Sequence, residues 1–357
     1  MAEKVLMRGN HAIVEGVIHA GCRFFAGYPI TPQNEIPEHM SVRMNEVGGV
    51  FLQTESEIGA INMLFGASAA GRRAMTSSSS PGISLMQEAL SYIAGSDVPV
   101  LVVNIVRGGP GLGNIAPAQS DYFQSTRGGG HGDYYTICLA PYSVQEMFEF
   151  PRLAFELGEK YRIPVVILAD GLLGQMMEPM EYTYQAVDPV GLPEPEWALS
   201  GCAGRGRRVV RSYDLRPGKL EEWNWKRAER YDLIRKQEVR YDAKSCDDAD
   251  LAIVAYGTSA RVAMAAVRQA RQKGIRAGLF RPVTLWPFPR KELGQLADRI
   301  KKFLVVEMSM GQMIEDVQLS ICGKAEVSFH GRPGGGVPTT AEVMGKIEAL
   351  VGQGGRV

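Results

Sequence analysis

The stretch AMTSSSSPGISLMQEALSYIAGSDVPVLVVNIVRGG, residues 74–109, carries the pattern that decides the fold. Its short apolar runs predict strands over 74–77 and 98–106, and the longer segment between them has the spacing of a helix over 82–94. Strand, helix and strand in this order form the repeating unit of a parallel sheet covered by helices. The stretch therefore predicts an α/β fold.

The same alternation continues on both sides of this stretch. Before it, we predict helices over 10–20 and 56–71 and strands over 22–27 and 49–53. After it, we predict strands over 137–140 and 164–169 and a helix over 144–161. A second series begins near Asp250, with predicted strands over 251–255, 277–281 and 303–307 and helices over 260–273 and 290–299. We expect two units, each built on a parallel sheet.

A segment without clear periodicity separates the two series. Residues 178–218 are rich in proline, which predicts an extended linker. From Gly204 to Asp242, twelve Lys or Arg face seven Asp or Glu. This excess indicates either docking onto an acidic partner or, as we prefer, a solvated helix with pairs such as Glu222 and Lys226. We place a first domain at 1–178, a linker with a charged helix at 179–248 and a second domain at 249–357.

Charge and hydropathy exclude several classes of protein. Among 357 residues, Lys plus Arg equals Asp plus Glu at 39 each, so no overall field attracts nucleic acid or an anionic membrane. The amino-terminal residues lack the apolar core of a signal peptide, and no window approaches the roughly 20 apolar residues of a membrane span. We expect a cytoplasmic protein that binds neither nucleic acid nor membrane.

The cysteines argue against a metal centre in this chain. Five cysteines, at 22, 138, 202, 246 and 322, are too far apart in sequence to form a zinc or iron–sulfur motif. Their sparse, odd number also fits a reducing compartment. We predict no metal ligands here.

Three predicted loops follow strands of the first sheet and should meet at one edge. They contain Thr31, the serine turn 77–82 and Arg107. Open parallel sheets bind ligands beyond the carboxyl ends of their strands. Arg107 has the forked guanidinium that binds a carboxylate with two hydrogen bonds, and Thr31 adds a hydroxyl. The alternative is that Arg107 pairs with a local acid, Thr31 caps a helix and the serines only begin one.

Two further positions have two interpretations each. Glu57 lies in the first turn of a predicted helix, where a carboxylate either stabilises the helix dipole or, when desolvated in a cleft, holds a proton. Gly257, Thr258 and Ser259 follow a predicted strand, where they either bind an anion or form a turn with Ser259 as the N-cap. The sequence does not choose between these interpretations.

Six longer motifs, spread along the chain, are informative when they are taken together. They are GYPITPQNEIPE (27–38), TESEIGAINMLFGASAAGRRAMTSSSSPGISLMQE (54–88), VNIVRGGPGLGN (103–114), AQSDYFQSTRGGGHGDY (118–134), ADGLLGQMMEP (169–179) and RPVTLWPFP (281–289). In this order they resemble the alpha subunit of 2-oxoacid:ferredoxin oxidoreductases of the 2-oxoisovalerate and 2-oxoglutarate types, which have separate small subunits. The resemblance covers almost the whole chain.

The resemblance implies a fold and a set of site residues. It implies a pyrimidine-type thiamine diphosphate-binding domain followed by a domain like the carboxyl-terminal one of transketolase. The family's cofactor glutamate falls on Glu57, whose carboxyl at the aminopyrimidine ring promotes loss of the thiazolium proton. The family's substrate threonine and arginine fall on Thr31 and Arg107. Further cofactor contacts are expected at Tyr28, Pro29 and Ser79.

The resemblance also implies a reaction that needs partners. The expected activity is oxidative decarboxylation of a 2-oxoacid to acyl-coenzyme A and carbon dioxide, with reduction of ferredoxin. Ala169-Asp170-Gly171 only partly matches the G-D-G motif that holds diphosphate and Mg²⁺, and the next asparagine is Asn224. We therefore expect a beta subunit to supply the diphosphate site, Mg²⁺ and a 4Fe–4S cluster, alongside gamma and ferredoxin-like delta subunits.

Other interpretations stay open at this stage. The chain is either catalytic or a non-catalytic assembly subunit of the same kind of complex. A nucleotide-binding protein using Gly257 is disfavoured because G-x-G-x-x-G is missing after a strand. A dicarboxylate substrate needs a second cation, for which Arg127 and His131 are candidates, whereas a branched-chain acid needs an apolar pocket.

Overall fold

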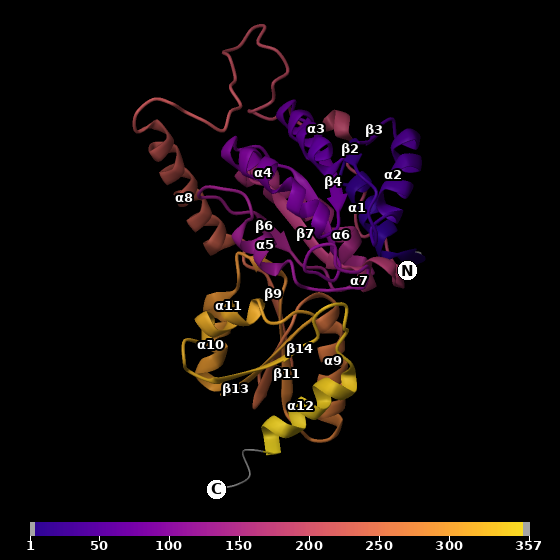
Figure 1. The fold of residues 1–357 in the computed structure, drawn as a ribbon, viewed down its shortest axis with the longest axis vertical. Helices are drawn as coiled ribbons and strands as arrows, with labels where there is room; N and C mark the ends of the chain where they lie inside the picture. Colours follow the sequence, from indigo (N-terminus) through magenta and orange to yellow (C-terminus); the bar gives the residue numbers. More distant parts are fainter. Residues whose placement is uncertain (1–3, 353–357) are drawn as a thin grey trace.

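A seven-stranded sheet forms the first half of the molecule. The computed structural model describes residues 4–352, and its first sheet has the order β12-β6-β7-β5-β4-β2-β3 (Figure 1). These strands are β2 (Phe24–Gly27), β3 (Val50–Gln53), β4 (Ala74–Ser78), β5 (Leu101–Val106), β6 (Ile137–Leu139), β7 (Val165–Asp170) and β12 (Thr284–Trp286). All the pairs except β12 with β6 are parallel. The predicted parallel α/β sheet is confirmed.

Helices cover both faces of this sheet. One core cluster places α3 (Glu57–Ala69) and α4 (Pro81–Gly95) on one face. Another cluster packs α1 (Gly9–His19), α2 (Glu35–Glu46) and α6 (Val144–Tyr161) against the sheet from the other side. Both faces of the central strands are therefore buried, which explains why the predicted run over 98–106 is apolar throughout. That strand begins at Leu101, three residues later than predicted.

Short elements complete the first unit. These are α5 (Tyr122–Arg127), α7 (Gly171–Gln175) and an antiparallel pair formed by β1 (Val5–Arg8) and β8 (Met177–Met180). The glycine-rich segment 107–133 follows the predicted strand over 98–106 and contains the helix α5. α2 was also absent from the prediction, although Glu35 and Glu38 lie in its first turn, where carboxylates stabilise a helix.

A five-stranded sheet forms the second unit. Its order is β14-β13-β10-β11-β9, with only β9 antiparallel. The strands are β9 (Tyr241–Lys244), β10 (Leu251–Val254), β11 (Ala277–Pro282), β13 (Lys302–Glu307) and β14 (Glu326–Gly331). The helices are α9 (Gly257–Gln272), α10 (Arg290–Arg299), α11 (Met313–Ile321) and α12 (Thr340–Gly352). Figure 1 shows this unit below the first.

The two units share structure across the predicted boundaries. β12 comes from the second half of the sequence but pairs with β6 of the first sheet, and Trp286 stacks on Tyr135 with ring centroids 4.7 Å apart. β9 falls inside the predicted linker 179–248 but pairs with β11 of the second sheet. The predicted boundaries therefore do not separate the two sheets. One cluster of buried apolar residues runs through both units.

The rest of the linker is extended except for two elements. A short 3₁₀ helix spans Pro189–Gly191, and α8 (Lys219–Gln237) lies beside the first unit (Figure 1). Many basic side chains of this segment pair with nearby acids, for example Lys219 with Glu222 at 2.8 Å. These pairs support the solvated helix over docking onto an acidic partner. Within residues 4–352, no helix is long and apolar enough to cross a bilayer.

Candidate active site

Five segments meet at the carboxyl edge of the first sheet. Because β2, β3, β4, β5 and β7 are mutually parallel, the residues that follow them lie along one edge. These segments carry the predicted residues Thr31, Glu57, Ser79, Arg107 and Asp170. The sequence prediction that such loops converge agrees with this topology.

Glu57 is a buried carboxylate at the start of a helix. Ser56 is the N-cap of α3 and accepts a hydrogen bond from the amide of Gly59 at 3.3 Å, which makes Glu57 the first helical residue. The Glu57 side chain is turned inward and the residue is only 4% exposed. The Ser78 hydroxyl donates to Glu57 Oε1 at 3.3 Å. The Glu57 carboxylate thus lies in the first turn of α3 and is buried, which fits stabilisation of the helix dipole, and its role toward a cofactor stays a prediction.

Gly82 leaves the space that Glu57 fills. A Cβ atom built on Gly82 would overlap both Ser78 Oγ and Glu57 Oε1. Glycine at the start of α4 is therefore required by the position of the Glu57 carboxylate. The sequence analysis missed this residue, because a glycine near a helix start gives no sign of what packs against it.

Arg107 links two of the predicted loops. Its guanidinium donates to the backbone carbonyls of Thr31 at 3.1 Å and Leu112 at 2.9 Å. Arg107 is 7% exposed, and its Nε has no partner. The alternative that Arg107 pairs with a local acid is wrong, since both of its partners are carbonyls.

Thr31 lies beside Arg107 but not as a helix cap. Its Oγ1 accepts a hydrogen bond from the side-chain amide of Asn34 at 3.1 Å, and Asn34 is the residue that precedes α2. Tyr28 and Pro29 are exposed on the same loop. Ser79 is fully buried at the end of β4, and its hydroxyl has no partner. The structure thus places all the predicted cofactor and substrate residues at one edge.

Several buried polar residues of this edge were not predicted. Gln33 donates to the Tyr28 carbonyl at 3.3 Å and accepts from the Ser77 hydroxyl at 2.6 Å, which holds the 28–33 loop against β4. Asn104 accepts from the amide of Ser80 at 3.2 Å and donates to Asp121 at 2.9 Å. In the sequence, the one sign of this network was Asn104, a polar residue within the otherwise apolar strand β5.

Asp170 bridges the two units. Its carboxylate accepts from the amides of Leu172 and Leu173 and from the Thr258 hydroxyl at 2.9 Å. Burial raises the pKa of Asp170. Because this carboxylate faces the first turn of α9, it lies where one of the two interpretations of Gly257, Thr258 and Ser259 placed an anion. Ser259 is not the N-cap, which is Tyr256, and its hydroxyl donates to Gln119.

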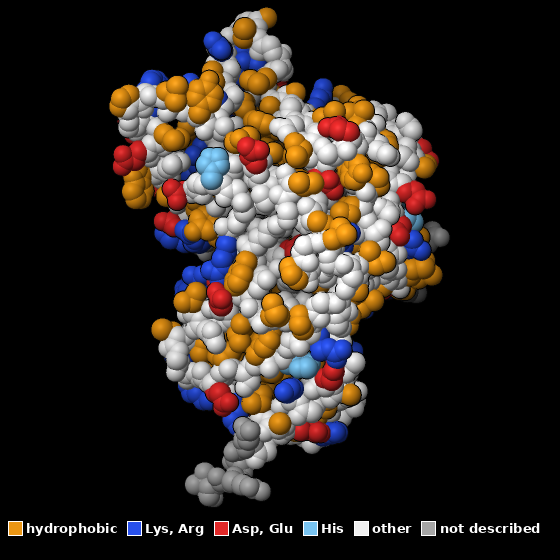
Figure 2. All heavy atoms as spheres, viewed as in Figure 1, with side chains coloured by type: hydrophobic (Ala, Val, Ile, Leu, Met, Phe, Trp, Pro, Cys, Tyr) orange, Lys and Arg blue, Asp and Glu red, His pale blue; other side chains and the backbone are white. Residues whose placement is uncertain are grey.

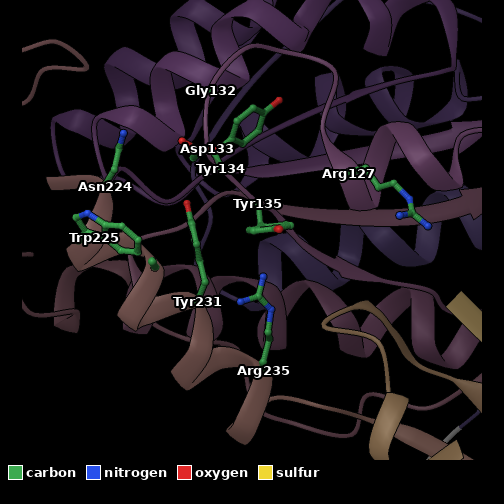
Figure 3. Close-up of a pocket in the computed structure, with 10 residues that line it drawn as sticks. Arg127, Gly132, Asp133, Tyr134, Tyr135, Asn224, Trp225, Tyr231 and Arg235 are labelled. Carbon is green, nitrogen blue, oxygen red and sulfur yellow. The ribbon is translucent and has the colours of Figure 1, made fainter. Parts of the chain in front are cut away.

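The two candidate second cations lie elsewhere. Arg127 lies 3.4 Å from Asp316 and packs over the Phe123 ring. It lines a cavity of about 470 Å³ between the glycine-rich segment and α8, shown in Figure 3. His131 is exposed near Tyr92, ten residues beyond Gly82 along α4, or about 15 Å at the helical rise. Neither residue joins Glu57 and Arg107.

Comparison with known proteins identifies this arrangement. Residues 15–198 match the family model described as pyruvate flavodoxin/ferredoxin oxidoreductase, thiamine diphosphate-binding, and residues 249–343 match pyruvate:ferredoxin oxidoreductase core domain II. The chain belongs to this oxidoreductase family. The resemblance seen in the sequence is confirmed, as is the thiamine diphosphate-binding fold.

Relatives within the oxidoreductase family match nearly end to end. Ketoisovalerate oxidoreductase subunit VorB of Methanothermobacter thermautotrophicus is 47% identical over 347 residues, which are 97% of this chain and 98% of the relative. The 2-oxoglutarate synthase subunit KorA of Methanothermobacter marburgensis is 38% identical over 374 residues, which cover 98% of this chain and 100% of the relative.

Solved structures agree on the architecture. A chain of the 2-oxoglutarate:ferredoxin oxidoreductase from Magnetococcus marinus superposes with a TM-score of 0.85 at 25% identity. The match covers 98% of this chain and 66% of that one. A split-gene transketolase chain is 13% identical with a TM-score of 0.61 and 97% of this chain covered, which supports the predicted transketolase-like fold alone.

The residues of the edge fit the aminopyrimidine end of thiamine diphosphate. The site offers a buried carboxyl at Glu57, a neighbouring position where only glycine fits, and a buried Ser79 hydroxyl without a partner. For the metal end the fit fails, because Asp170 is already bound by Thr258 and two amides. Within residues 4–352, no three His, Cys, Asp or Glu side chains gather as a metal site.

Proposed function

We propose that this chain is the alpha subunit of a thiamine diphosphate-dependent 2-oxoacid:ferredoxin oxidoreductase, with Glu57 as the acid that activates the cofactor. The observation that carries this proposal is the buried Glu57 carboxyl facing Gly82 at the carboxyl edge of the first sheet. When bound, thiamine diphosphate supplies the carbon nucleophile that attacks a 2-oxo group. Glu57 would hold or move a proton at the pyrimidine ring, and Tyr28, Pro29 and Ser79 would contribute to holding that ring.

Arg107 and Thr31 are proposed to orient the substrate. The unpartnered Arg107 Nε and the Thr31 hydroxyl offer donors for the carboxylate of a 2-oxoacid. The Arg107 guanidinium is already fixed by two carbonyls, so the substrate binds a group that is held in place before it arrives. Such preorganisation lowers the entropy that is lost when the reacting groups are brought together.

We propose an apolar, branched-chain 2-oxoacid as the substrate. The segment 108–121 contains no Lys, Arg or His, and it exposes Leu112 and Ile115. Arg127 pairs with Asp316 and His131 lies beside Tyr92, so neither of these two candidate second cations contacts Arg107 in the described residues. The 47% identity to the ketoisovalerate relative, against 38% for the 2-oxoglutarate one, supports the same choice.

Partner subunits are proposed to complete the cofactor site. A beta subunit supplies the diphosphate and Mg²⁺ site and a 4Fe–4S cluster, and gamma and ferredoxin-like delta subunits complete a cytoplasmic complex that uses coenzyme A and ferredoxin. The face of α3 and α4 is the proposed contact with the beta subunit. From Ile58 to Gly71 the chain has no charged residue, although Ile58 and Met63 are exposed. Exposed apolar side chains on an uncharged helix are typical of a surface that a partner covers.

The test is Glu57→Gln in the complex assembled with its partner subunits. The amide cannot exchange the proton, so we expect kcat for 2-oxoacid-dependent ferredoxin reduction to fall by about 10²- to 10⁴-fold. Glu55→Gln is the matched control, because Glu55 is exposed two residues away and should leave the rate unchanged. Wild-type complex is assayed with 2-oxoisovalerate, 2-oxoglutarate and pyruvate. Full activity of Glu57→Gln would instead identify a non-catalytic assembly subunit.

A further inference from the structure

The segment 107–121 is held at both ends. At its start, the amide of Arg107 donates to the Ser80 hydroxyl at 3.1 Å, and the Arg107 side chain binds Thr31 and Leu112. At its end, the amide of Gln119 donates to the Met308 carbonyl and the Gln119 Oε1 accepts from the Met308 amide, both at 2.9 Å. The first anchor belongs to the proposed active site and the second to the other unit.

Between these anchors the segment has little packing of its own. It closes on itself through two backbone hydrogen bonds of 2.9 Å, from Gly108 to Ala116 and from Asn114 to Gly108. Leu112 at the tip is 80% exposed. Four glycines and a proline between 108 and 113 give no side chain that reaches the core. A glycine-rich segment of this kind loses much conformational entropy when it is ordered, so a third contact matters.

That third contact comes from the second unit, through residues 332–337 after β14. The Asn114 side-chain amide donates to the Gly334 carbonyl at 3.0 Å, while its Oδ1 accepts from the Ala116 amide at 2.9 Å. Gly335 has φ +95°, and a Cβ atom there would lie 2.6 Å from the Ala116 Cβ. The two segments approach so closely that glycine is needed at position 335.

We infer that the 332–337 segment of the second unit positions the substrate arginine by holding the 107–121 segment through Asn114. Asn114 is a positioning residue, because it acts on Arg107 through the backbone between them. The inference rests on the proposed role of Arg107. It implies that the second unit contributes to substrate binding by holding the segment that carries this arginine. Loosening this contact should let the Leu112 carbonyl leave the Arg107 guanidinium, which weakens capture of the substrate carboxylate more than the later chemistry.

The experiment compares variants within the assembled complex. For Asn114→Ala and Gly335→Ala we expect KM for the 2-oxoacid to rise roughly tenfold while kcat stays within about twofold. We also expect faster amide hydrogen exchange across 108–116. Asn45→Ala is the control, since Asn45 bonds only to its own helix at the Ser41 carbonyl.

Two further variants separate close contact from backbone strain. Gly334→Ala also places a side chain at positive φ, but nothing lies within 4 Å of its Cβ, so it should change KM less than Gly335→Ala. Adding Ala116→Gly to Gly335→Ala removes the clashing atom and should recover most of the wild-type KM. An unchanged KM in Asn114→Ala and Gly335→Ala, with or without faster exchange, would overturn the inference. If the wild-type complex turned over no 2-oxoacid, the proposed function would fail, and the inference that rests on it would fail too. Unchanged hydrogen exchange in Asn114→Ala would overturn the inference and leave the proposed function standing.

Discussion

At the scale of single residues, the site depends on a contact between a carboxylate and a glycine. Glu57 was expected from its place in the sequence, but its buried position depends on the missing Cβ of Gly82 and on the hydroxyl of Ser78. The position of the glutamate was therefore easier to predict than the residues that pack against it. Arg107 shows the same difference, because its carbonyl partner on Thr31 lies 76 residues away in sequence.

Gly82→Ala tests this contact. The added methyl group must displace the Glu57 carboxylate or the Ser78 hydroxyl. Because the proposed acid would then be misplaced, we expect kcat to fall at least about tenfold. Gly345→Ala is the control: this glycine is exposed within α12 with nothing near its Cβ, and alanine there should stabilise the fold by up to about 1 kcal/mol. Assays and thermal melts of both variants measure the two effects. A fully active Gly82→Ala enzyme would contradict the assigned role of the glycine.

At the scale of elements, most helices and strands agree with the sequence prediction, and two of the missed strands share a cause. α6 spans the predicted residues 144–161, because Ser143 caps it and its apolar face is periodic. The strands β9 and β12 were missed because each pairs with a segment far along the chain, whereas the 12-residue helix α2 was missed although acidic residues lie in its first turn. Strand pairing with distant segments does not appear in a local pattern.

The attachment of α8 illustrates such a long-range contact. Asp97 follows α4, and its carboxylate binds Arg227 Nε at 3.1 Å and Trp223 Nε1 at 2.9 Å, both on α8. Burial alone would raise the pKa of Asp97, but Arg230 and Arg227 outweigh it and hold the pKa below its ordinary value of 3.8. The carboxylate is therefore charged in the folded protein at neutral pH.

Asp97→Asn should detach α8. Arg227 is 5% exposed and would lose its charge partner, so we expect a loss of about 3 kcal/mol in the free energy of unfolding near pH 7. Asn also tolerates the positive φ of position 97, so the change mainly removes charge. Since the folded pKa of Asp97 is depressed, its contribution is complete above about pH 3.8 and is lost as the pH falls through the folded value.

Denaturant unfolding from pH 7 to pH 3, followed through tryptophan fluorescence, measures this difference in the free energy of unfolding. The gap between wild type and Asp97→Asn should narrow toward pH 3. Asp232→Asn is the control, because Asp232 pairs with Arg235 only at the surface and should cost at most about 0.5 kcal/mol. A gap of constant size at all pH values would show that charge at Asp97 is not what holds α8.

At the scale of the whole molecule, the two units are joined by several contacts, and the surface of α3 and α4 exposes apolar side chains. Asp170 with Thr258, Gln119 with Met308 and the stacked Tyr135 and Trp286 join the units. Figure 2 shows hydrophobic side chains spread over the upper unit, where Figure 1 places α3 and α4. The sequence predicted the need for a partner from half a cofactor motif, and the face of α3 and α4 is our proposed position for that partner.

Met63→Lys tests whether α3 meets the beta subunit. Met63 is 43% exposed in the middle of α3, so lysine should leave the folded chain within a few degrees of the wild-type melting temperature. In the complex the charge would be buried without a partner, at a cost of about 3 kcal/mol or more, which weakens assembly at least about 100-fold. Co-purification and light scattering with the beta subunit measure assembly. Leu319→Lys, on exposed α11 of the second unit, should assemble normally, and equal assembly of both variants would place the beta subunit on another face.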